Sequence, residues 1–223
     1  MFTGYNTIMK QRIRKGGVQT ARGFLFELTG GDVSLDFANT VDLRPTRQPR
    51  ELIPRYEDLL SWGRQARLLS TGKIATLRKM AKRNPAGAIA AHRRAIEARE
   101  VLFQIFAHLA EGKRVSRRVL SKWNRILPQS IAHYEMVADQ HGFTWTLRPE
   151  NLQFDSLLWP VIHSAIQLLT GPNASRIRMC AGANCNWVFL DESKRGNRRW
   201  CDMTVCGNRA KARAFYTRKK HQS

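Results

Sequence analysis

The stretch CDMTVCGNRAKARAFYTRKK, residues 201–220, places two cysteines ahead of a segment in which basic residues alternate with alanines and aromatics. From Asn208 to Lys220 no Gly or Pro interrupts the helix-forming residues, so the pattern predicts a helix that begins at Cys206. The positive end of the helix dipole favours a thiolate at that place. We therefore expect Cys201 and Cys206 to fasten the start of a basic helix to the rest of the protein.

The cysteines of the chain form two close pairs, in the pattern C-x4-C-x15-C-x4-C: Cys180, Cys185, Cys201 and Cys206. Two such pairs are typical of a structural zinc site, in which four sulfurs surround the ion at about 2.3 Å. Four thiolates complete the tetrahedral shell and leave no position for a substrate, so the predicted Zn²⁺ is structural rather than catalytic. Disulfides, which would need an oxidising compartment, and free thiols remain the alternatives.

The residues between the two pairs predict a hairpin. Asn186–Leu190 is β-branched and aromatic, as strands are; residues 191–197 are polar, as turns are; and residues 198–200 return as a short strand that leads into Cys201. Phe215 and Tyr216 of the helix are expected to pack on this hairpin. The predicted C-terminal module, residues 173–223, is thus a zinc-stabilised β-hairpin followed by a helix.

The charge of the chain indicates a polyanionic partner. Lys and Arg number 38 against 17 Asp and Glu, which gives a formal charge of +21, and twelve of the 38 basic residues follow position 175, with only three acids. Such an excess is typical of nucleic-acid-binding proteins; an anionic membrane surface and a merely solvated basic face are the alternatives. The residues expected to contact nucleic acid are Arg195, Arg198, Arg199, Arg209, Lys211, Arg213 and Arg218.

The N-terminal segment, residues 1–23, is basic and contains no acid. It lacks the apolar core of a secretory signal, and its apolar residues do not repeat at helical spacing, so a flexible basic arm is favoured over an organelle transit peptide. No apolar run reaches the roughly eighteen residues of a membrane-spanning helix. We therefore expect no membrane partner.

Residues 24–172 predict a second, mostly helical domain, so the whole chain belongs to the α+β class with small antiparallel ribbons. Residues 24–28 and the pair 132–138 and 143–147 alternate like strands. Trp62, Trp123, Trp145 and Trp159 are expected in the core. The predicted helices are one that starts at Asp32 or Ser34, one over 56–69, a long one from Asn84 to Gly112, one over 116–127 that stops before Pro128, and one that Asp155 caps and that runs to Gly171.

Two stretches resemble a known family. Residues 176–220 resemble the CGNR zinc finger, named for the tetrad Cys206-Gly207-Asn208-Arg209, and the surrounding W-V-F-L-D, R-R-W-C-D-M and K-A-R-A-F-Y segments agree. The stretch S-L-D-F-A-N-T-V-D at residues 34–42 and L-S-W at 60–62 resemble the ABATE domain that precedes this finger. The resemblance implies a bacterial, cytoplasmic, nucleoid-associated transcription regulator linked to stress, with the four cysteines as zinc ligands. Asn186 departs from the glycine expected after Cys185, but Asn tolerates a left-handed turn.

Other functions leave weaker traces. Asp36, Asn39 and Asp42 are spaced to line a small-molecule pocket, although capping and solvating a short helix explains them better. An effector ligand and a homodimer are therefore open expectations. An RNA- or ribosome-associated zinc protein is the alternative function, with Trp187 and Trp200 as candidate base-stacking residues. The sequence contains no phosphate-binding glycine loop, nucleophile elbow or zinc-protease motif, so no enzyme is expected.

Overall fold

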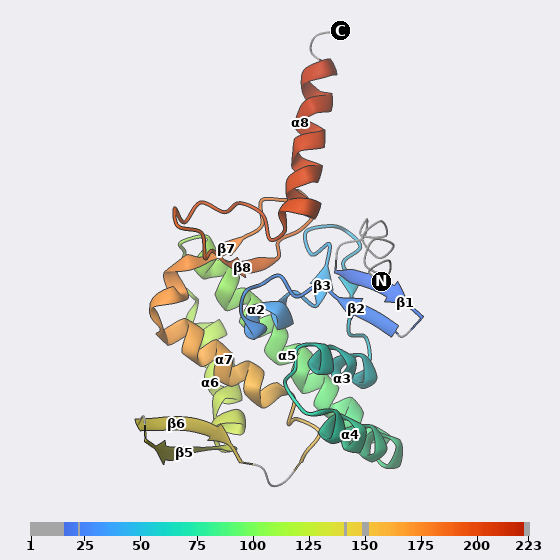
Figure 1. The fold of residues 1–223 in the computed structure, drawn as a ribbon, viewed down its shortest axis with the longest axis vertical. Helices are drawn as coiled ribbons and strands as arrows, with labels where there is room; N and C mark the ends of the chain where they lie inside the picture. Colours follow the sequence, from blue (N-terminus) through green and yellow to red (C-terminus); the bar gives the residue numbers. More distant parts are fainter. Residues whose placement is uncertain (1–15, 22, 141, 149–151, 221–223) are drawn as a thin grey trace, which may run out of the picture.

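The longest helix, α5 (Pro85–Ala110), runs through the middle of the molecule (Figure 1). The computed structural model describes residues 16–21, 23–140, 142–148 and 152–220. Asn84 starts α5, because its side chain accepts a hydrogen bond from the N–H of Gly87 and Pro85 fills the first turn, where a missing N–H does no harm. The helix has an apolar stripe, of which Leu109 is half-buried and the rest is buried: Ala91, Ala95, Ala98, Leu102, Ile105 and Phe106.

Further helices pack around α5. Four of them contact it directly, and α7 packs against α2 and α6 instead. One helix, α4, is not among the expected elements, because only Ile74 and Leu77 of its residues are buried and its apolar stripe is correspondingly weak. The helices are α2 (Val33–Ala38), α3 (Tyr56–Gln65), α4 (Thr71–Arg83), α6 (Arg117–Ile131) and α7 (Leu158–Thr170).

The strands form small antiparallel ribbons rather than one sheet, which confirms the predicted α+β class. Their register is regular, and in the longest ribbon Met136 faces Trp145. The ribbon β1–β2 corrects one expectation, since β1 lies inside the segment 1–23 predicted to be a flexible arm; residues 1–15 lie outside the described part. The ribbons are β1 (Gly17–Thr20) with β2 (Gly23–Phe26), β3 (Val41–Asp42) with β4 (Arg50–Glu51), β5 (Tyr134–Asp139) with β6 (Gly142–Leu147), and β7 (Ile177–Met179) with β8 (Val188–Leu190).

Three local predictions are wrong. Helix α6 continues through Pro128 to Ile131, because a proline in the last turn removes only one hydrogen bond and the helix is already packed on its neighbours. Asp155 does not cap α7 with its side chain, since that carboxylate receives a hydrogen bond of 3.0 Å from the Nε of Arg94. Trp145 is 49% exposed, whereas the other three tryptophans expected in the core are buried.

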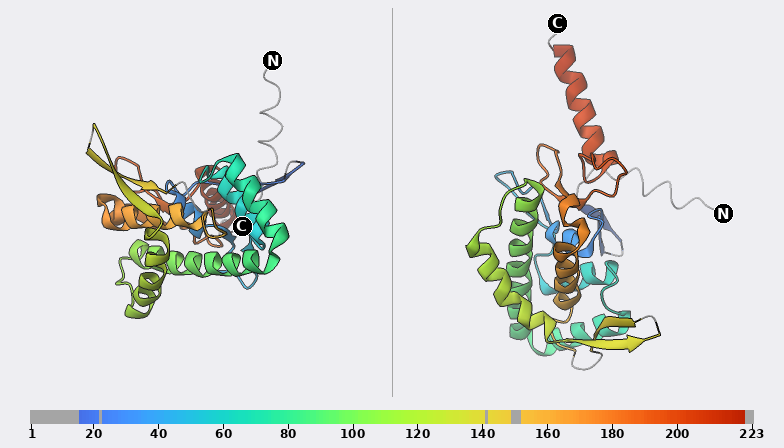
Figure 2. Two further views of the ribbon diagram at one scale, coloured as in Figure 1. Left: turned by 90° about the horizontal axis from the view of Figure 1, so that it is seen from below. Right: turned by 90° about the vertical axis from the view of Figure 1, so that its left-hand side faces the viewer.

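The core crosses the expected boundary at residue 172. Ribbon β7–β8 lies against α2 and α5, and the buried Val188 and Phe189 join the same apolar cluster as Phe37 and Leu102. The base of the C-terminal module is therefore part of the body. Helix α8 (Asn208–Lys220) behaves differently, because it projects from this base along the long axis and its described side chains from Lys211 onward are exposed (Figure 1, Figure 2).

Candidate metal centre and basic helix

The four cysteines meet at one buried point. Their sulfur atoms all lie within 4.8 Å of one another, with 3.7 Å between Cys185 and Cys201 and 3.9 Å between Cys201 and Cys206. A tetrahedral ion about 2.3 Å from each sulfur requires neighbouring sulfurs to lie about 3.8 Å apart, so the observed spacing fits one structural zinc ion. All four cysteines are free thiols in the structure, as zinc ligands must be.

The electrostatics of the cluster favour a cation at its centre. Hydrogen bonds from the other three thiols lower the pKa of Cys180, whereas the hydrogen bond with Cys180, together with burial, raises the pKa of Cys201. Four thiolates cannot coexist this close in a buried place unless a positive charge offsets their repulsion. A divalent ion does so and turns each sulfur into a ligand.

The first cysteine pair sits on a turn that only small or left-handed residues can form. Cys185 N–H donates to the carbonyl of Gly182, and a Cβ on Gly182 would lie 3.1 Å from the sulfur of Cys206. Asn186 has φ of 55°, so it adopts the left-handed conformation expected where a glycine is usual. The turn closes when Cys180 N–H donates to the carbonyl of Trp187 at 2.8 Å.

The second pair is organised by Asp202, a residue that the sequence analysis did not single out. Its carboxylate accepts from the N–H groups of Thr204 and Val205, and its carbonyl accepts from those of Cys206 and Gly207. The resulting wide turn, Met203–Gly207, leads directly into α8. A Cβ on Gly207 of the CGNR tetrad would lie 2.4 Å from the sulfur of Met203, so a larger residue there would have to displace that exposed side chain. An Asp two residues ahead of a Thr, as in a side-chain cap, is the sequence signal that could have found Asp202.

The hairpin between the pairs differs from the predicted one. Strand β8 pairs with β7 upstream, with Ile177 facing Leu190, and residues 198–200 form no strand. The reason is Arg198, whose guanidinium turns inward and donates to the carbonyls of Leu190, Trp200 and Cys201 while it stacks 4.4 Å from the ring centre of Phe189. Arg198, expected to contact nucleic acid, therefore holds the zinc module together.

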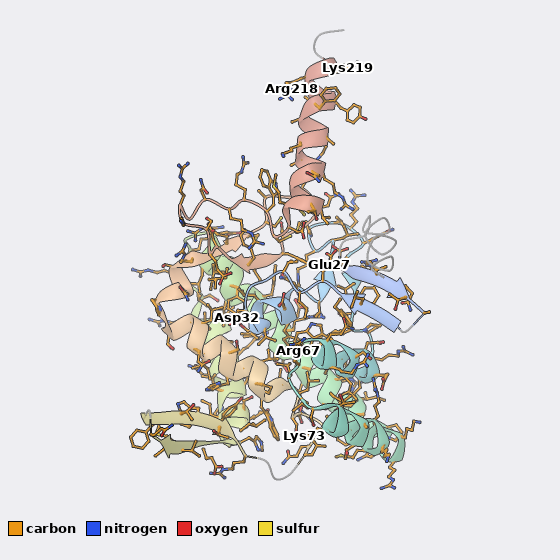
Figure 3. The ribbon with its side chains drawn as sticks, viewed as in Figure 1. Glu27, Asp32, Arg67, Lys73, Arg218 and Lys219 are labelled. Carbon is orange, nitrogen blue, oxygen red and sulfur yellow. The ribbon has the colours of Figure 1, made fainter. Side chains whose placement is uncertain are left out.

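The other basic candidates are exposed. Arg195 and Arg199 lie on the loop before the second cysteine pair, and Arg209, Lys211, Arg213 and Arg218 lie along α8. Figure 3 shows Arg218 near the far end of that helix, well away from the body. Phe215 and Tyr216 are 56% and 70% exposed, so the expectation that they pack on the hairpin is wrong. Helix α8 leaves the body within its first turn, and the two rings contact each other instead, with 5.7 Å between their centres.

A small hollow joins the zinc knuckle to the helix. It has a volume of about 60 Å³ and is lined by the turn Gly182, Ala183 and Asn184 together with Cys206, Arg209 and Arg213. Arg209 and Arg213 are one helical turn apart and thus lie on the same face of α8. Backbone groups of a tight turn and two guanidinium groups therefore border the same small space.

Asp36, Asn39 and Asp42 each bind a different part of the chain. The Asn39 side chain is buried and pairs with the backbone of Val188, donating to its carbonyl at 2.8 Å and accepting from its N–H at 2.9 Å. Asp36 accepts from the N–H of Gly30 at 2.7 Å, and burial raises the pKa of its carboxyl to about 7. Asp42 pairs with Arg50.

These contacts dock the C-terminal module on the body. The carbonyl of Gly30 accepts from the N–H of Leu190 at 2.7 Å, and the indole N–H of Trp187 donates to the carbonyl of Val41 at 3.0 Å. Gly30 and Asn39 thus hydrogen-bond the backbone of β8, as a neighbouring strand would. Trp187 is 1% exposed, so it cannot stack on RNA bases as the alternative function would require, and Trp200 is partly buried.

A second hollow, of about 400 Å³, lies in the body beside the first cysteine turn and is lined in part by Asn186. Two ion pairs border it: Arg99 with Glu51 at 2.6 Å and Arg44 with Glu100 at 2.8 Å. Each guanidinium is matched by a carboxylate, so the hollow presents no net charge. No conventional motif marks these residues, which the tertiary structure brings together from three separate segments.

Comparison with known families agrees with this geometry. Residues 31–172 match the ABATE model, described as "Putative stress-induced transcription regulator", and residues 176–219 match the CGNR zinc finger model. Neither is an enzyme family. No curated protein matches the chain. In the part of the chain that the structure describes, no helix is long and apolar enough to cross a membrane. The ABATE match spans more than half of the chain and the CGNR match includes all four zinc-binding cysteines, so the chain belongs to the ABATE family and carries a CGNR zinc finger.

Proposed function

We propose that the protein is a transcription regulator that binds duplex DNA through helix α8. The observation that carries the proposal is the exposure of a basic helix whose start is held by the zinc site. From Asn208 to Lys220 the helix contains six Lys and Arg and no acid, and it projects from the body (Figure 1). A basic surface of this kind matches the regularly spaced phosphates of nucleic acid.

The dimensions of α8 suit the major groove. Thirteen residues at about 1.5 Å each give a helix of about 20 Å, and the major groove, about 12 Å wide, admits one helix. Because the described side chains from Lys211 onward are exposed, any face of the helix could turn toward the bases of the groove. Lys211 and Arg218 would then reach phosphates or guanine edges along the groove.

The hollow beside the zinc site offers a place for one backbone phosphate. Arg209 and Arg213 border it together with the turn at residues 182–184. A guanidinium group can donate two parallel hydrogen bonds to the oxygens of one phosphate. Such contacts position a protein on DNA without reading its sequence. The exposed Arg195 and Arg199 extend the same basic surface along the neighbouring loop.

A single-stranded nucleic acid is the second candidate, because Phe215 and Tyr216 are exposed on the basic helix. Aromatic rings beside cationic side chains are the usual platforms on which unpaired bases stack. Trp187 is unavailable for this role, so the candidate rests on these two rings alone.

The test compares one labelled duplex DNA with single-stranded DNA and RNA of the same length, by fluorescence anisotropy over a range of salt concentrations. We expect the duplex to bind most tightly, with a logarithmic affinity that falls linearly with the logarithm of salt concentration. The double variant Arg213→Ala/Arg218→Ala should reduce this slope by up to about two, roughly one for each lost phosphate contact.

The matched control removes the same amount of charge from the body. Lys79→Ala/Lys82→Ala changes two exposed lysines of α4, a helix far from α8 in Figure 1, and should leave the slope unchanged. A slope that both double variants reduce equally would show that binding depends on net charge alone and would refute the proposed interface. Tighter binding to a single strand, weakened by Tyr216→Ala, would favour the second candidate.

A further inference from the structure

The ribbon β5–β6 has one apolar face that the described part of the chain leaves largely exposed. Residues that face each other across an antiparallel pair point to the same side, so Met136 with Trp145 and Ala138 with Phe143 share one face of the ribbon. Phe143 is 77% exposed and Met136 is 56% exposed. Large apolar side chains gathered on one exposed face mark an interaction surface.

The ribbon stands apart from the body. Its two strands pair only with each other among the described strands, and Figure 2 shows it projecting beyond the helices. A lone two-stranded ribbon is marginally stable in water, and it gains stability when its apolar face is covered. In Figure 1 it lies at the opposite end of the long axis from α8.

A hollow of about 320 Å³ opens beneath the ribbon, between its base and helices α6 and α7. Ile131, Tyr134, Trp145 and Ile166 supply most of its wall, and no Lys, Arg, Asp or Glu lines it. Tyr134 stacks on His163, with 4.4 Å between the ring centres, which fixes the base of the ribbon on α7. An exposed aromatic ring and an apolar hollow thus occur side by side on one surface.

Charge identifies the occupant of this surface. Residues 126–175 contain a single basic residue, Arg148, and four acids, although the whole chain carries a formal charge of +21. Two copies of so basic a chain repel each other wherever their Lys and Arg residues would meet. The surface formed by these fifty residues is where two copies can approach, and it offers nothing to nucleic acid or to an anionic membrane.

We propose that the β5–β6 ribbon and the hollow beneath it form a two-fold interface between two copies of this chain. In such an arrangement each copy inserts its Phe143 into the hollow of the other, and the symmetry closes the contact at two copies. The interface would bury on the order of 1,000 Å² of accessible surface, contributed by Met136, Phe143 and Trp145 of both copies and the surfaces they cover. That area is enough for a specific interface. The proposal does not depend on nucleic-acid binding, because α8 remains free at the far ends.

The test is the oligomeric state of the zinc-loaded full chain, free of nucleic acid, by analytical ultracentrifugation over a wide range of concentrations. We expect a monomer–dimer equilibrium that higher salt strengthens, since salt screens the repulsion between the two basic chains. Phe143→Ser should raise the dimer dissociation constant by at least about tenfold, because each copy loses a buried aromatic ring.

The matched control is Thr144→Ser, at the neighbouring position on the other face of the ribbon, which should leave the equilibrium unchanged. A second pair of single variants repeats the comparison on the other strand: Met136→Ser changes the apolar face, and Val137→Ser is its control on the opposite face. One poorly folded variant therefore does not decide the result. Circular dichroism verifies that each variant is folded. A wild-type chain that stays monomeric at every concentration, or a Phe143→Ser chain that dimerises as Thr144→Ser does, would overturn the proposal.

Discussion

Helix α8 and the β5–β6 ribbon both project from the body, at opposite ends of its long axis, yet their surfaces differ in kind (Figure 1). The helix carries six basic residues and no acid, whereas the ribbon, residues 134–147, carries no Lys or Arg and exposes Phe143, Trp145 and Met136. Exposed charges are stable in water, so the basic residues of α8 need no cover. The apolar face of the ribbon is not stable there, which indicates a surface that is covered in the functional state.

The two ends are also attached differently. Cys206 ties the start of α8 to the zinc site, and from Lys211 onward the described side chains of the helix are exposed. Stacked rings hold the ribbon instead, with His133 lying 3.5 Å from Trp159 between ring centres. One end therefore depends on a metal and the other on side-chain packing. Four measurements test this contrast and the docking of the finger on the body.

Removal of zinc should have the largest effect. Structural zinc contributes on the order of 10 kcal/mol to small modules, and Cys206 places the start of α8 at the zinc site. We expect chelation to disorder the two cysteine turns and α8, while β8, which packs in the core, and the β5–β6 ribbon, which no thiol supports, keep their structure. Amide NMR spectra with and without metal would report both regions at once. Unchanged α8 signals in the metal-free spectrum, or equal losses at both ends, would contradict the contrast.

Asp36 should make the attachment of the finger depend on pH. Its carboxyl holds Gly30, which in turn binds Leu190, and burial raises the pKa of Asp36 from its usual 3.8 to about 7. Between these values the folded state binds more protons than the unfolded state, so stability falls as the pH rises from about 4 to about 7. The loss amounts to at most about 4 kcal/mol, since one pKa unit is worth about 1.4 kcal/mol.

The measurement for Asp36 is urea unfolding of the zinc-loaded chain at several pH values, compared with Asp36→Asn. The amide of the variant still accepts from Gly30 but does not titrate in this range, so its advantage over the wild type should grow between pH 4 and 7. Taking the difference between the two proteins cancels any loss of zinc at low pH that they share. A difference that stays constant across this range would show that Asp36 has an ordinary pKa.

Asn39→Ala should loosen the base of the finger. The substitution leaves the N–H and carbonyl of Val188 buried without partners, at a cost of roughly 2–3 kcal/mol. Asn173→Ala, at an exposed position, serves as the control and should change the free energy of unfolding by less than about 0.5 kcal/mol. Denaturant unfolding measures both. If the two variants are equally stable, Asn39 does not dock the finger.

Replacing Arg198 should affect mainly stability and replacing Arg199 mainly DNA binding, and this is the smallest of the four expected effects. Arg198→Ala removes the donor to four carbonyls and should lower stability by about 1–2 kcal/mol, whereas the exposed Arg199 should be replaceable at almost no cost in stability. Arg199→Ala should instead weaken binding to duplex DNA. Thermal unfolding and anisotropy titrations on the same samples test the pair, and a reversed pattern would exchange the two roles.

Much of the fold follows from local signals. Helix α5 was predicted between Asn84 and Gly112 because a cap, a proline at the first position and a long apolar stripe agree over its whole length. The β5–β6 ribbon was predicted because its alternation and its turn both lie within one short segment. Helix α4 was missed, since two buried residues make too weak a stripe to distinguish a helix from a polar loop.

The candidate site divides in the same way. The four zinc ligands could be identified because sulfur chemistry and close spacing restrict what cysteines do, whatever surrounds them. The inward orientation of Arg198 could not be predicted, because the sequence does not distinguish an arginine that binds phosphate from one that binds the protein's own backbone. The partner of β8 was also misassigned, since pairing with residues 198–200 and pairing with residues 177–179 are equally compatible with its composition.

Residue chemistry and short-range spacing alone thus determined that this protein has a zinc site, a basic helix and a helical body. The fold decided how these parts are joined: Asn39 meets Val188 across 149 positions of the chain, and the Val41 carbonyl meets Trp187 across 146. Hydrogen bonds between such distant residues form only when buried backbone groups have no water to bind, and burial is a property of the packed molecule. For the same reason the exposure of Phe143 and Tyr216 could be known only from the structure.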